Sequence, residues 1–240
     1  MSARAALITG ASSGIGLAIA HVLGEEGHGL TIAARRPDKL ESAAGALREA
    51  GFEVQAVAGN MADEQDVARV VAAHRERFGR LDVLVNSAGV GAGAPVAELL
   101  TKRVDLQLDV NLRGPVLLYR EAIGLLRAAG AEHRNALVIN LSSLSGKSGQ
   151  PWLSVYSATK AGLIGFTQAM NKELNAEGVK SVALAPGFVD TPMADFIKES
   201  IPAEEMIRTS DIAEAVRFLL RLSPNAVVPE IVFQRPGESP

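Results

Sequence analysis

Residues 154–163, "SVYSATKAGL", place a phenol and an ammonium four positions apart. Tyr156 is one of 2 tyrosines in the chain, and Lys160 would share its helix face because residues four apart are neighbours there. The pKa of a free phenol is about 10, which suits proton transfer poorly at neutral pH, but a nearby ammonium favours the phenolate. The spacing predicts an acid–base pair, although such a pair on an exposed helix is commonly without function.

A glycine-rich loop is the second group of residues that could do chemistry. "TGASSGIG", residues 9–16, has glycines at positions 10, 14 and 16 between an apolar run and a helical pattern. Glycines permit a sharp turn and let a pyrophosphate approach the amides at a helix N-terminus. Leu17 stands where a P-loop needs lysine, and the glycine order is not G-x-G-x-x-G. We therefore predict a dinucleotide-binding loop of another type, rather than a plain turn of small residues.

The elements that must position these residues alternate regularly along the chain. Short apolar runs alternate with stretches that have apolar residues at spacings of three and four, such as 66–78 and 211–222. The runs are residues 5–9, 29–34, 52–58, 81–86, 136–142, 179–185 and 230–234. This pattern predicts an α/β fold, a Rossmann-type doubly wound parallel sheet of about seven strands with helices on both faces. We expect one domain over residues 1–240, with a substrate-loop segment at 188–208 and the ligand beyond the carboxyl ends of the strands.

Composition and charge exclude several classes of function. The formal net charge is -3 and no basic run is longer than Arg35–Arg36, so nucleic acid is not an expected partner. No apolar stretch is long enough to span a membrane, and the first residues lack a signal peptide's features. The chain has no cysteine, which excludes disulfides and thiolate metal sites. We expect a soluble cytoplasmic protein, and we predict no metal because the histidines at 21, 28, 74 and 133 lack ligand spacing.

Three further motifs indicate a known family. "NSAG" at 86–89, "NLRGP" at 111–115 and "PGFVDT" at 186–191 accompany the glycine loop and the Tyr–Lys pair. Together they resemble the short-chain dehydrogenase/reductase family over nearly the whole chain, with Ser87 in place of the family's second Asn. The resemblance implies an NAD(P)-dependent enzyme that interconverts a carbonyl and a secondary alcohol by hydride transfer. The alternative is a dinucleotide-sensing binding protein of the same fold, and such proteins often lose the tyrosine or lysine retained here.

The resemblance implies four catalytic residues, Asn111, Ser143, Tyr156 and Lys160. Tyr156 is the general acid/base of the family's reaction. Ser143 hydrogen-bonds the substrate oxygen and stabilises the charge that develops on it. Lys160 also holds the nicotinamide ribose, and Asn111 orders a water that links Lys160 to solvent.

The end of the second predicted strand indicates which dinucleotide binds. Folds that prefer NAD place a carboxylate there for the ribose 2′-hydroxyl, whereas this chain has Ala34 followed by Arg35 and Arg36. Two guanidiniums can bind a 2′-phosphate, so we predict a preference for NADP(H), with an NAD(H)-dependent dehydrogenase as the alternative. Asn60 replaces the Asp that usually accepts a hydrogen bond from the adenine amine, and a neutral amide accepts that bond less strongly. The predicted cofactor-binding residues are Gly10, Ser12, Ser13, Gly14, Ile15, Gly16, Arg35, Arg36, Asn60, Met61, Asn86, Ala88, Gly89, Tyr156, Lys160, Pro186, Gly187, Val189 and Thr191.

The loops after the fourth, fifth and sixth predicted strands should line the substrate pocket. Its predicted residues are Ser143, Leu144, Trp152, Phe188 and Met193, although apolar residues at such spacing serve packing as often as a pocket. They suit a medium-sized ketone or secondary alcohol, including a 3-oxoacyl thioester, as the small-molecule partner. Relatives assemble through the helices that correspond to residues 97–129 and 152–177, so we expect a homo-dimer or homo-tetramer.

Overall fold

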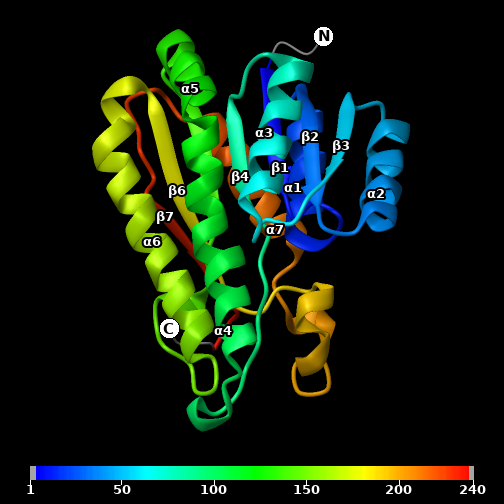
Figure 1. The fold of residues 1–240 in the computed structure, drawn as a ribbon, viewed down its shortest axis with the longest axis vertical. Coiled ribbons are helices and arrows are strands. Elements are labelled where there is room, and N and C mark those ends of the chain that lie inside the picture. The colour runs from blue at the N-terminus through cyan, green and yellow to red at the C-terminus, as the bar shows by residue number, and fades with distance from the viewer. Residues whose placement is uncertain (1–3, 238–240) are drawn as a thin grey trace.

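Parallel strands form the sheet that carries the candidate site. The computed structural model describes residues 4–237, and the strand order of its 7-stranded sheet is β3-β2-β1-β4-β5-β6-β7 (Figure 1). The strands are β1 (Arg4–Thr9), β2 (His28–Ala34), β3 (Val54–Ala58), β4 (Val83–Asn86), β5 (Ala136–Leu141), β6 (Val179–Pro186) and β7 (Glu230–Phe233). Each strand coincides with one of the predicted apolar runs, so the predicted Rossmann-type sheet is confirmed.

Helices cover both faces of this sheet. They are α1 (Gly14–Glu25), α2 (Pro37–Glu49), α3 (Glu64–Phe78), α4 (Thr101–Leu108), α5 (Gly114–His133), α6 (Ser154–Leu174) and α7 (Thr209–Leu220). Helices α1, α2 and α7 pack on one face, and α3, α5 and α6 pack on the other, which faces the viewer in Figure 1. Among residues 4–237, no helix combines the length and the apolar character needed to cross a bilayer.

The helix predicted over residues 152–177 is shorter in the structure. Trp152 has a φ of 62°, a left-handed conformation that a right-handed helix cannot include, so α6 begins at Ser154. A 3₁₀ turn at Asn175–Glu177 follows its last residue, and Gly178, with a φ of 80°, ends it. The segment "SVYSATK" therefore forms the first turns of α6, and Tyr156 and Lys160 share one helix face as predicted.

Alternate side chains of the strands build two apolar layers. In β1, Ala6 and Ile8 belong to the layer under α1, α2 and α7, whereas Leu7 between them belongs to the layer under α3, α5 and α6. Because both faces are covered, the strand is apolar at consecutive positions instead of alternating with polar residues. Full burial of a Leu or Ile side chain contributes roughly 1.5–3 kcal/mol, so these layers hold the strand ends firmly in place.

The carboxyl ends of the central strands meet at one edge of the sheet. Thr9 pairs with Asn86, and Asn86 pairs with Asn140, so β1, β4 and β5 are aligned in register there. The segment 188–208 lies beyond this edge, at the lower end of Figure 1 in orange. It contains two 3₁₀ turns, and a bridge between Val189 and Ile207 closes its base. The segment therefore interrupts the strand–helix rhythm where the sequence predicts it.

Candidate active site

Three elements bring the four predicted catalytic residues to the carboxyl edge of the sheet. Tyr156 and Lys160 project from the start of α6, and the Lys160 ammonium lies over the Tyr156 ring, 5.6 Å from its centroid. Ser143 lies two residues beyond the end of β5, where its hydroxyl is 3.5 Å from the Pro186 carbonyl and also interacts with the Tyr156 side chain. Asn111 lies in a π-helical turn between α4 and α5. The structure therefore brings together residues that are up to 49 positions apart in the chain.

The Lys160 ammonium is buried rather than solvated. Only 4% of the residue is exposed, and Nζ donates a 2.6 Å hydrogen bond to the backbone oxygen of Leu141, the last residue of β5. The Ser142 hydroxyl donates a 2.9 Å hydrogen bond to the Lys160 carbonyl, which attaches α6 to the same strand end. Burial disfavours the charged form and lowers the pKa of Lys160 to about 8. The lysine can therefore give up its proton near physiological pH.

The pKa of Tyr156 departs from the prediction made from its spacing. Burial raises the pKa of Tyr156 above 10.0, and the hydrogen bond with Ser143 offsets this only in part. The predicted lowering by Lys160 is wrong for this structure, because the ammonium donates its hydrogen bond to Leu141 and not to the phenol. A phenol with a raised pKa stays protonated at neutral pH, which is the form that a proton donor requires.

The side chain of Asn111 is held on three hydrogen bonds. Its Oδ1 accepts from the Val90 amide at 2.8 Å, and its Nδ2 donates to the Val90 carbonyl at 2.9 Å. Nδ2 also donates to the Thr159 hydroxyl at 3.2 Å, and that hydroxyl donates to the Tyr156 carbonyl at 2.7 Å. Asn111 is 1% exposed, so this network attaches the loop after β4 to the helix that carries Tyr156 and Lys160.

The glycine loop packs directly on the loop that follows strand β4. Gly10 has a φ of 68°, and a Cβ there would lie 2.7 Å from the Ala88 amide nitrogen. A Cβ at Gly16 would lie 2.6 Å from the Gly10 carbonyl oxygen, so these two positions require glycine for close backbone approach. The Thr9 hydroxyl accepts hydrogen bonds from the amides of Ser87 and Ala88, both at 3.2 Å. The glycine loop and "NSAG" thus form one continuous wall of the site.

The N-terminus of α1 is suited to an anion. Ser13 occupies its N-cap position, and its side chain makes no capping hydrogen bond. Amides in the first helical turn have no partner within the helix and carry its positive dipole end. Thr191, at the start of the 188–208 segment, lies against the loop, since its methyl carbon would be 3.1 Å from a Cβ at Gly14. The residues present therefore fit the pyrophosphate of a dinucleotide.

The two arginines after β2 are free to bind an anion. Arg35 and Arg36 are exposed, and neither side chain has a hydrogen bond or ion pair within residues 4–237. Arg36 is the N-cap residue of α2, which begins at Pro37. Two unpaired guanidiniums at the end of β2 match the position expected for the 2′-phosphate group of NADP(H).

The proposed adenine end is less open than the sequence suggests. Asn60 Oδ1 accepts a 3.3 Å hydrogen bond from the Ala62 amide, so this oxygen is already engaged in a local turn. The Asn60 amide donates to Asp66 Oδ2 at 2.8 Å, and the Met61 side chain is buried. Asn86 is buried as well, and its Nδ2 donates to Asn140 Oδ1 at 2.7 Å. Asn60 and Met61 therefore shape the backbone of the site more than they offer free side-chain groups, whereas Asn86 Oδ1 is buried with no hydrogen-bond partner among residues 4–237.

The nicotinamide end of the proposed site has space beside the catalytic groups. A Cβ at Gly89 would lie 3.5 Å from Asn111 Oδ1 and 3.6 Å from Lys160 Nζ, so glycine leaves this volume open. The remaining predicted cofactor residues lie around the same edge, with Ser12 and Ile15 in the glycine loop, Pro186 at the end of β6, and Gly187 and Val189 directly after it. Their roles toward a cofactor stay predictions.

The predicted pocket residues differ in exposure. Trp152 is 70% exposed, and Met193 is 52% exposed, whereas Leu144 is buried. The Trp152 carbonyl accepts a 2.9 Å hydrogen bond from the Ala94 amide, which joins the loops after β4 and β5. Phe188 is half-buried at the base of the 188–208 segment. Trp152 and Met193 are therefore the predicted pocket residues with the most surface to offer a substrate.

The four histidines have structural surroundings. His28 and His74 are buried, and burial lowers the pKa of His74 to about 4. His133 Nε2 lies 2.9 Å from Asp82 Oδ1, and His21 Nδ1 lies 3.3 Å from a Glu25 oxygen. Within residues 4–237, no group of three or more ligating side chains is placed to hold a metal ion.

Sequence comparison agrees with this geometry. The family model described as short chain dehydrogenase matches residues 4–202. A 3-oxoacyl-[acyl-carrier-protein] reductase from Staphylococcus aureus is 34% identical over 225 residues, which cover 90% of this chain and 90% of that protein.

Solved structures share the whole fold. A variant of actinorhodin polyketide ketoreductase, solved with NADPH, has a TM-score of 0.86 and 33% identity, and the match covers 96% of this chain and 94% of that one. A 3-ketoacyl-(acyl-carrier-protein) reductase from Brucella melitensis, solved with NADH, has a TM-score of 0.87 and 30% identity, with 98% of each chain covered. The chain therefore belongs to the short-chain dehydrogenase family and is an oxidoreductase that acts on carbonyl or alcohol groups.

Proposed function

We propose that this protein is an NADP(H)-dependent carbonyl reductase whose single domain uses Tyr156 as the general acid/base. The observation that carries this proposal is the convergence of Ser143, Tyr156, Lys160 and Asn111 beside the glycine loop at one edge of the sheet. A binding protein without turnover would not need a buried lysine beside a half-buried phenol. The similarity to reductases of 3-oxoacyl thioesters and of a polyketide supports the carbonyl as the group that is reduced.

NADP(H) is the proposed cofactor. The N-terminus of α1 would hold the pyrophosphate, and the unpaired Arg35 and Arg36 would hold the 2′-phosphate. NAD(H) remains the alternative, because the Brucella melitensis relative was solved with NADH. When bound, the nicotinamide supplies the hydride for the carbonyl carbon.

The protein's own residues manage the proton. Ser143 donates a hydrogen bond to the substrate carbonyl and polarises it. Tyr156, whose raised pKa keeps it protonated at neutral pH, donates its proton to the oxygen as negative charge develops there. Lys160, with its pKa lowered to about 8, can then return a proton toward the phenolate, and Asn111 lines the route from solvent. In the oxidative direction Tyr156 must first lose its proton, so alcohol oxidation requires a higher pH than ketone reduction.

The substrate class that we propose is a 3-oxoacyl thioester or a ketone of similar size. Exposed apolar side chains near the site, Trp152, Met193 and Phe196, suit an acyl chain better than a charged group. The named relatives reduce compounds of this class, which supports the assignment.

Assembly and location form a further part of the proposal. Leu100, Leu106, Leu108 and Val116 are exposed apolar residues on or beside α4 and α5, where water contact is unfavourable. We propose that these helices and α6 join copies of the chain into a homo-dimer or homo-tetramer. The absence of cysteine is compatible with the reducing cytoplasm that we propose as its location.

A fluorescence titration followed by a turnover assay tests the proposed function. The purified protein is titrated with NADPH and with NADH, and acetoacetyl thioesters and simple ketones are then added with the tighter-binding cofactor. The proposal predicts tighter NADPH binding and carbonyl-dependent loss of absorbance at the reduced nicotinamide band. Binding of NADPH without turnover on any carbonyl would favour a sensor, and tighter binding of NADH would overturn the role of Arg35 and Arg36.

A further inference from the structure

The turn that carries Asn111 is a local departure from α-helical geometry. Residues Asp109–Arg113 form a π-helical turn between α4 and α5. Such turns are rare, hold one residue more than an α-helical turn, and occur frequently at functional sites. Here the wide turn buries Asn111 against the Val90 backbone while Arg113, two residues later, stays on the surface. The position of Asn111 therefore depends on what holds this turn in place.

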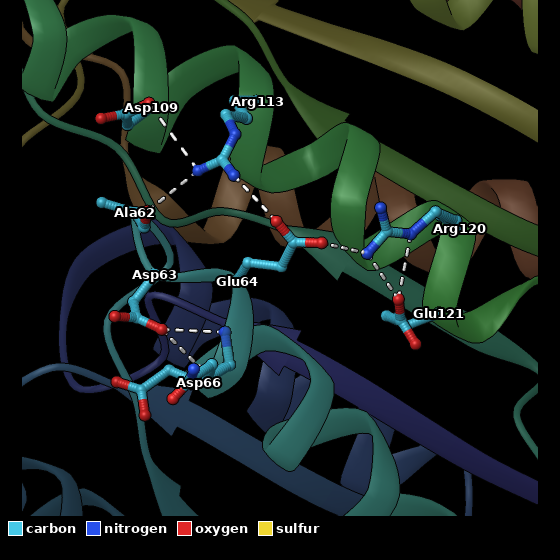
Figure 2. A network of polar contacts seen from close by, with 9 residues as sticks. Ala62, Asp63, Glu64, Asp66, Asp109, Arg113, Arg120 and Glu121 are labelled. Carbon is cyan, nitrogen blue, oxygen red and sulfur yellow. Dashed lines mark hydrogen bonds and ion pairs between the residues drawn. The ribbon is translucent and has the colours of Figure 1, made fainter.

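Glu64, the first residue of α3, holds the outer side of the turn. Figure 2 shows Glu64 between Arg113 and Arg120, with each guanidinium on a different carboxylate oxygen. Arg113 Nη2 donates to Glu64 Oε2 at 3.0 Å, and Arg113 Nη1 donates to the Ala62 carbonyl at 3.4 Å. Arg113 Nη1 also lies 4.0 Å from Asp109 Oδ1, within the same turn. Arg113 thus connects both ends of the π-helical turn to the segment before α3.

The segment before α3 is itself rigidly built. Asp63 caps α3 by accepting hydrogen bonds from the amides of Gln65 and Asp66. Asn60 closes a turn through Ala62, as described above, and its amide bonds Asp66. The segment also approaches Gly114, the residue directly after the π-helical turn, by backbone alone, since the Met61 carbonyl oxygen would lie only 2.5 Å from a Cβ there. No side chain separates the two segments at this point.

Arg113 and Arg120 bind the same Glu64 carboxylate, but only Arg113 also contacts the π-helical turn and the segment before α3. Hydrogen bonding and charge interaction with Arg120, followed by a smaller charge interaction with Arg113, hold the pKa of Glu64 below its ordinary value, so the carboxylate is charged at neutral pH. Arg120 lies in regular α5 and also bonds the neighbouring Glu121. Its loss should leave the π-helical turn untouched. The side chains of Arg113 and Arg120 are 47% and 55% exposed, so they form a matched pair of substitutions.

We propose that Glu64 and Arg113 are positioning residues that hold the π-helical turn, and with it Asn111, against the segment that follows β3. This segment is the one expected at the adenine end of the cofactor, so the ion pair links that end to the proton route at Lys160. The inference rests on the proposed function and adds two residues that make no contact with substrate or cofactor. Exposed ion pairs add little to global stability, so their loss should act locally.

The test compares Glu64→Gln and Arg113→Gln with Arg120→Gln as the matched control. Amide hydrogen exchange over residues 109–113 is measured first, because this readout needs no substrate. Both positioning variants should exchange faster there than wild type, while Arg120→Gln should match wild type. With NADPH and a reducible ketone, kcat should then fall about tenfold, within the roughly 10²-fold that a misplaced group can cost, and KM should change little. Arg113→Lys, which keeps the charge, should recover part of both losses.

The pH profile separates positioning from a structural effect. If Asn111 is displaced, the pH dependence of kcat should shift in Glu64→Gln because proton delivery to Lys160 is impaired. Equal exchange rates and equal kcat values in Glu64→Gln, Arg113→Gln and Arg120→Gln would overturn the inference. A uniform loss of thermal stability without a local change at residues 109–113 would also overturn it. If wild type itself fails to turn over any carbonyl, the proposed function fails, and the exchange comparison still decides the role of the ion pair.

Discussion

The Lys160 ammonium lies over the ring of Tyr156 at 5.6 Å from its centroid, but it donates its hydrogen bond to the Leu141 carbonyl. The lysine therefore does not neutralise a phenolate in this structure. Instead burial favours the neutral form of both groups, raising the pKa of Tyr156 and lowering that of Lys160. At neutral pH Tyr156 therefore keeps the proton that reduction of a carbonyl requires.

Burial of Lys160 predicts a measurable dependence of stability on pH. Its pKa falls from 10.5 to about 8 on folding, so between these values the unfolded chain binds more protons than the folded one. Stability should therefore rise with pH across this window, by about 3 kcal/mol in total for this group. Denaturant unfolding at several pH values should show wild type gaining stability relative to Lys160→Met as pH rises.

Lys172→Met is the control for that experiment. Lys172 is exposed on the same helix, so its removal should leave the pH dependence of wild type intact. Parallel curves for wild type and Lys160→Met would show that burial of the ammonium has no such cost.

The two arginines after β2 predict a selective loss of NADPH affinity. A charge-assisted hydrogen bond contributes about 1.5–3 kcal/mol, so Arg35→Ser or Arg36→Ser should raise the Kd for NADPH roughly 10–100-fold. The Kd for NADH should change little, because NADH lacks the 2′-phosphate. Arg48→Ser removes another exposed guanidinium, from the far end of α2, and should change neither Kd. Equal losses for both cofactors would assign the arginines to a different role.

Glycine at position 10 is required by packing, and this predicts opposite effects at two glycines. Gly10→Ala would place a Cβ 2.7 Å from the Ala88 amide and on a backbone with a φ of 68°, so it should destabilise the protein and weaken cofactor binding. Gly45→Ala, in α2 with open space around the new Cβ, should stabilise the protein by up to about 1 kcal/mol. Thermal unfolding of both variants checks the contrast, which would be lost if Gly10→Ala melted like wild type.

The left-handed conformation of Trp152 predicts that two substitutions will separate strain from substrate contact. Trp152→Gly should be more stable than Trp152→Ala by roughly 1–2 kcal/mol, because only glycine adopts a φ of 62° without penalty. Both variants lack the indole, so both should raise KM for a bulky ketone to a similar degree. A normal KM in both variants would remove Trp152 from the pocket, and equal melting temperatures would show that the conformation is unstrained.

Much of the fold was predictable because its signals are local. The apolar runs mark the strands, since a sheet covered on both faces needs apolar residues at consecutive positions. The α2 start at Pro37 follows from the fixed φ of proline. The start of α6 was misplaced by two residues, because nothing in the side chain of Trp152 signals its left-handed φ.

The site was predictable in its side chains and not in its backbone. The family resemblance predicts Ser143, Tyr156, Lys160 and Asn111 as site residues, and the fold brings them to one edge. Lys160 donates its hydrogen bond to a main-chain carbonyl, and Asn111 bonds the backbone of residue 90. Every residue type has these backbone groups, so the sequence contains no signal for either contact. The π-helical turn likewise depends on contacts between distant segments. The hydroxyl of Thr159 could have been noticed, since it precedes Lys160 directly.

The central claim is that Tyr156 supplies the proton to the carbonyl oxygen, and the Tyr156→Phe variant tests it most directly. Its steady-state kcat with NADPH and a reducible ketone is compared with wild type, with the Kd for NADPH measured on the same preparation. General acid catalysis is worth about 10²–10⁴-fold, so kcat should fall by that factor while the Kd stays near the wild-type value. A variant that binds NADPH normally and keeps the wild-type kcat would contradict the account.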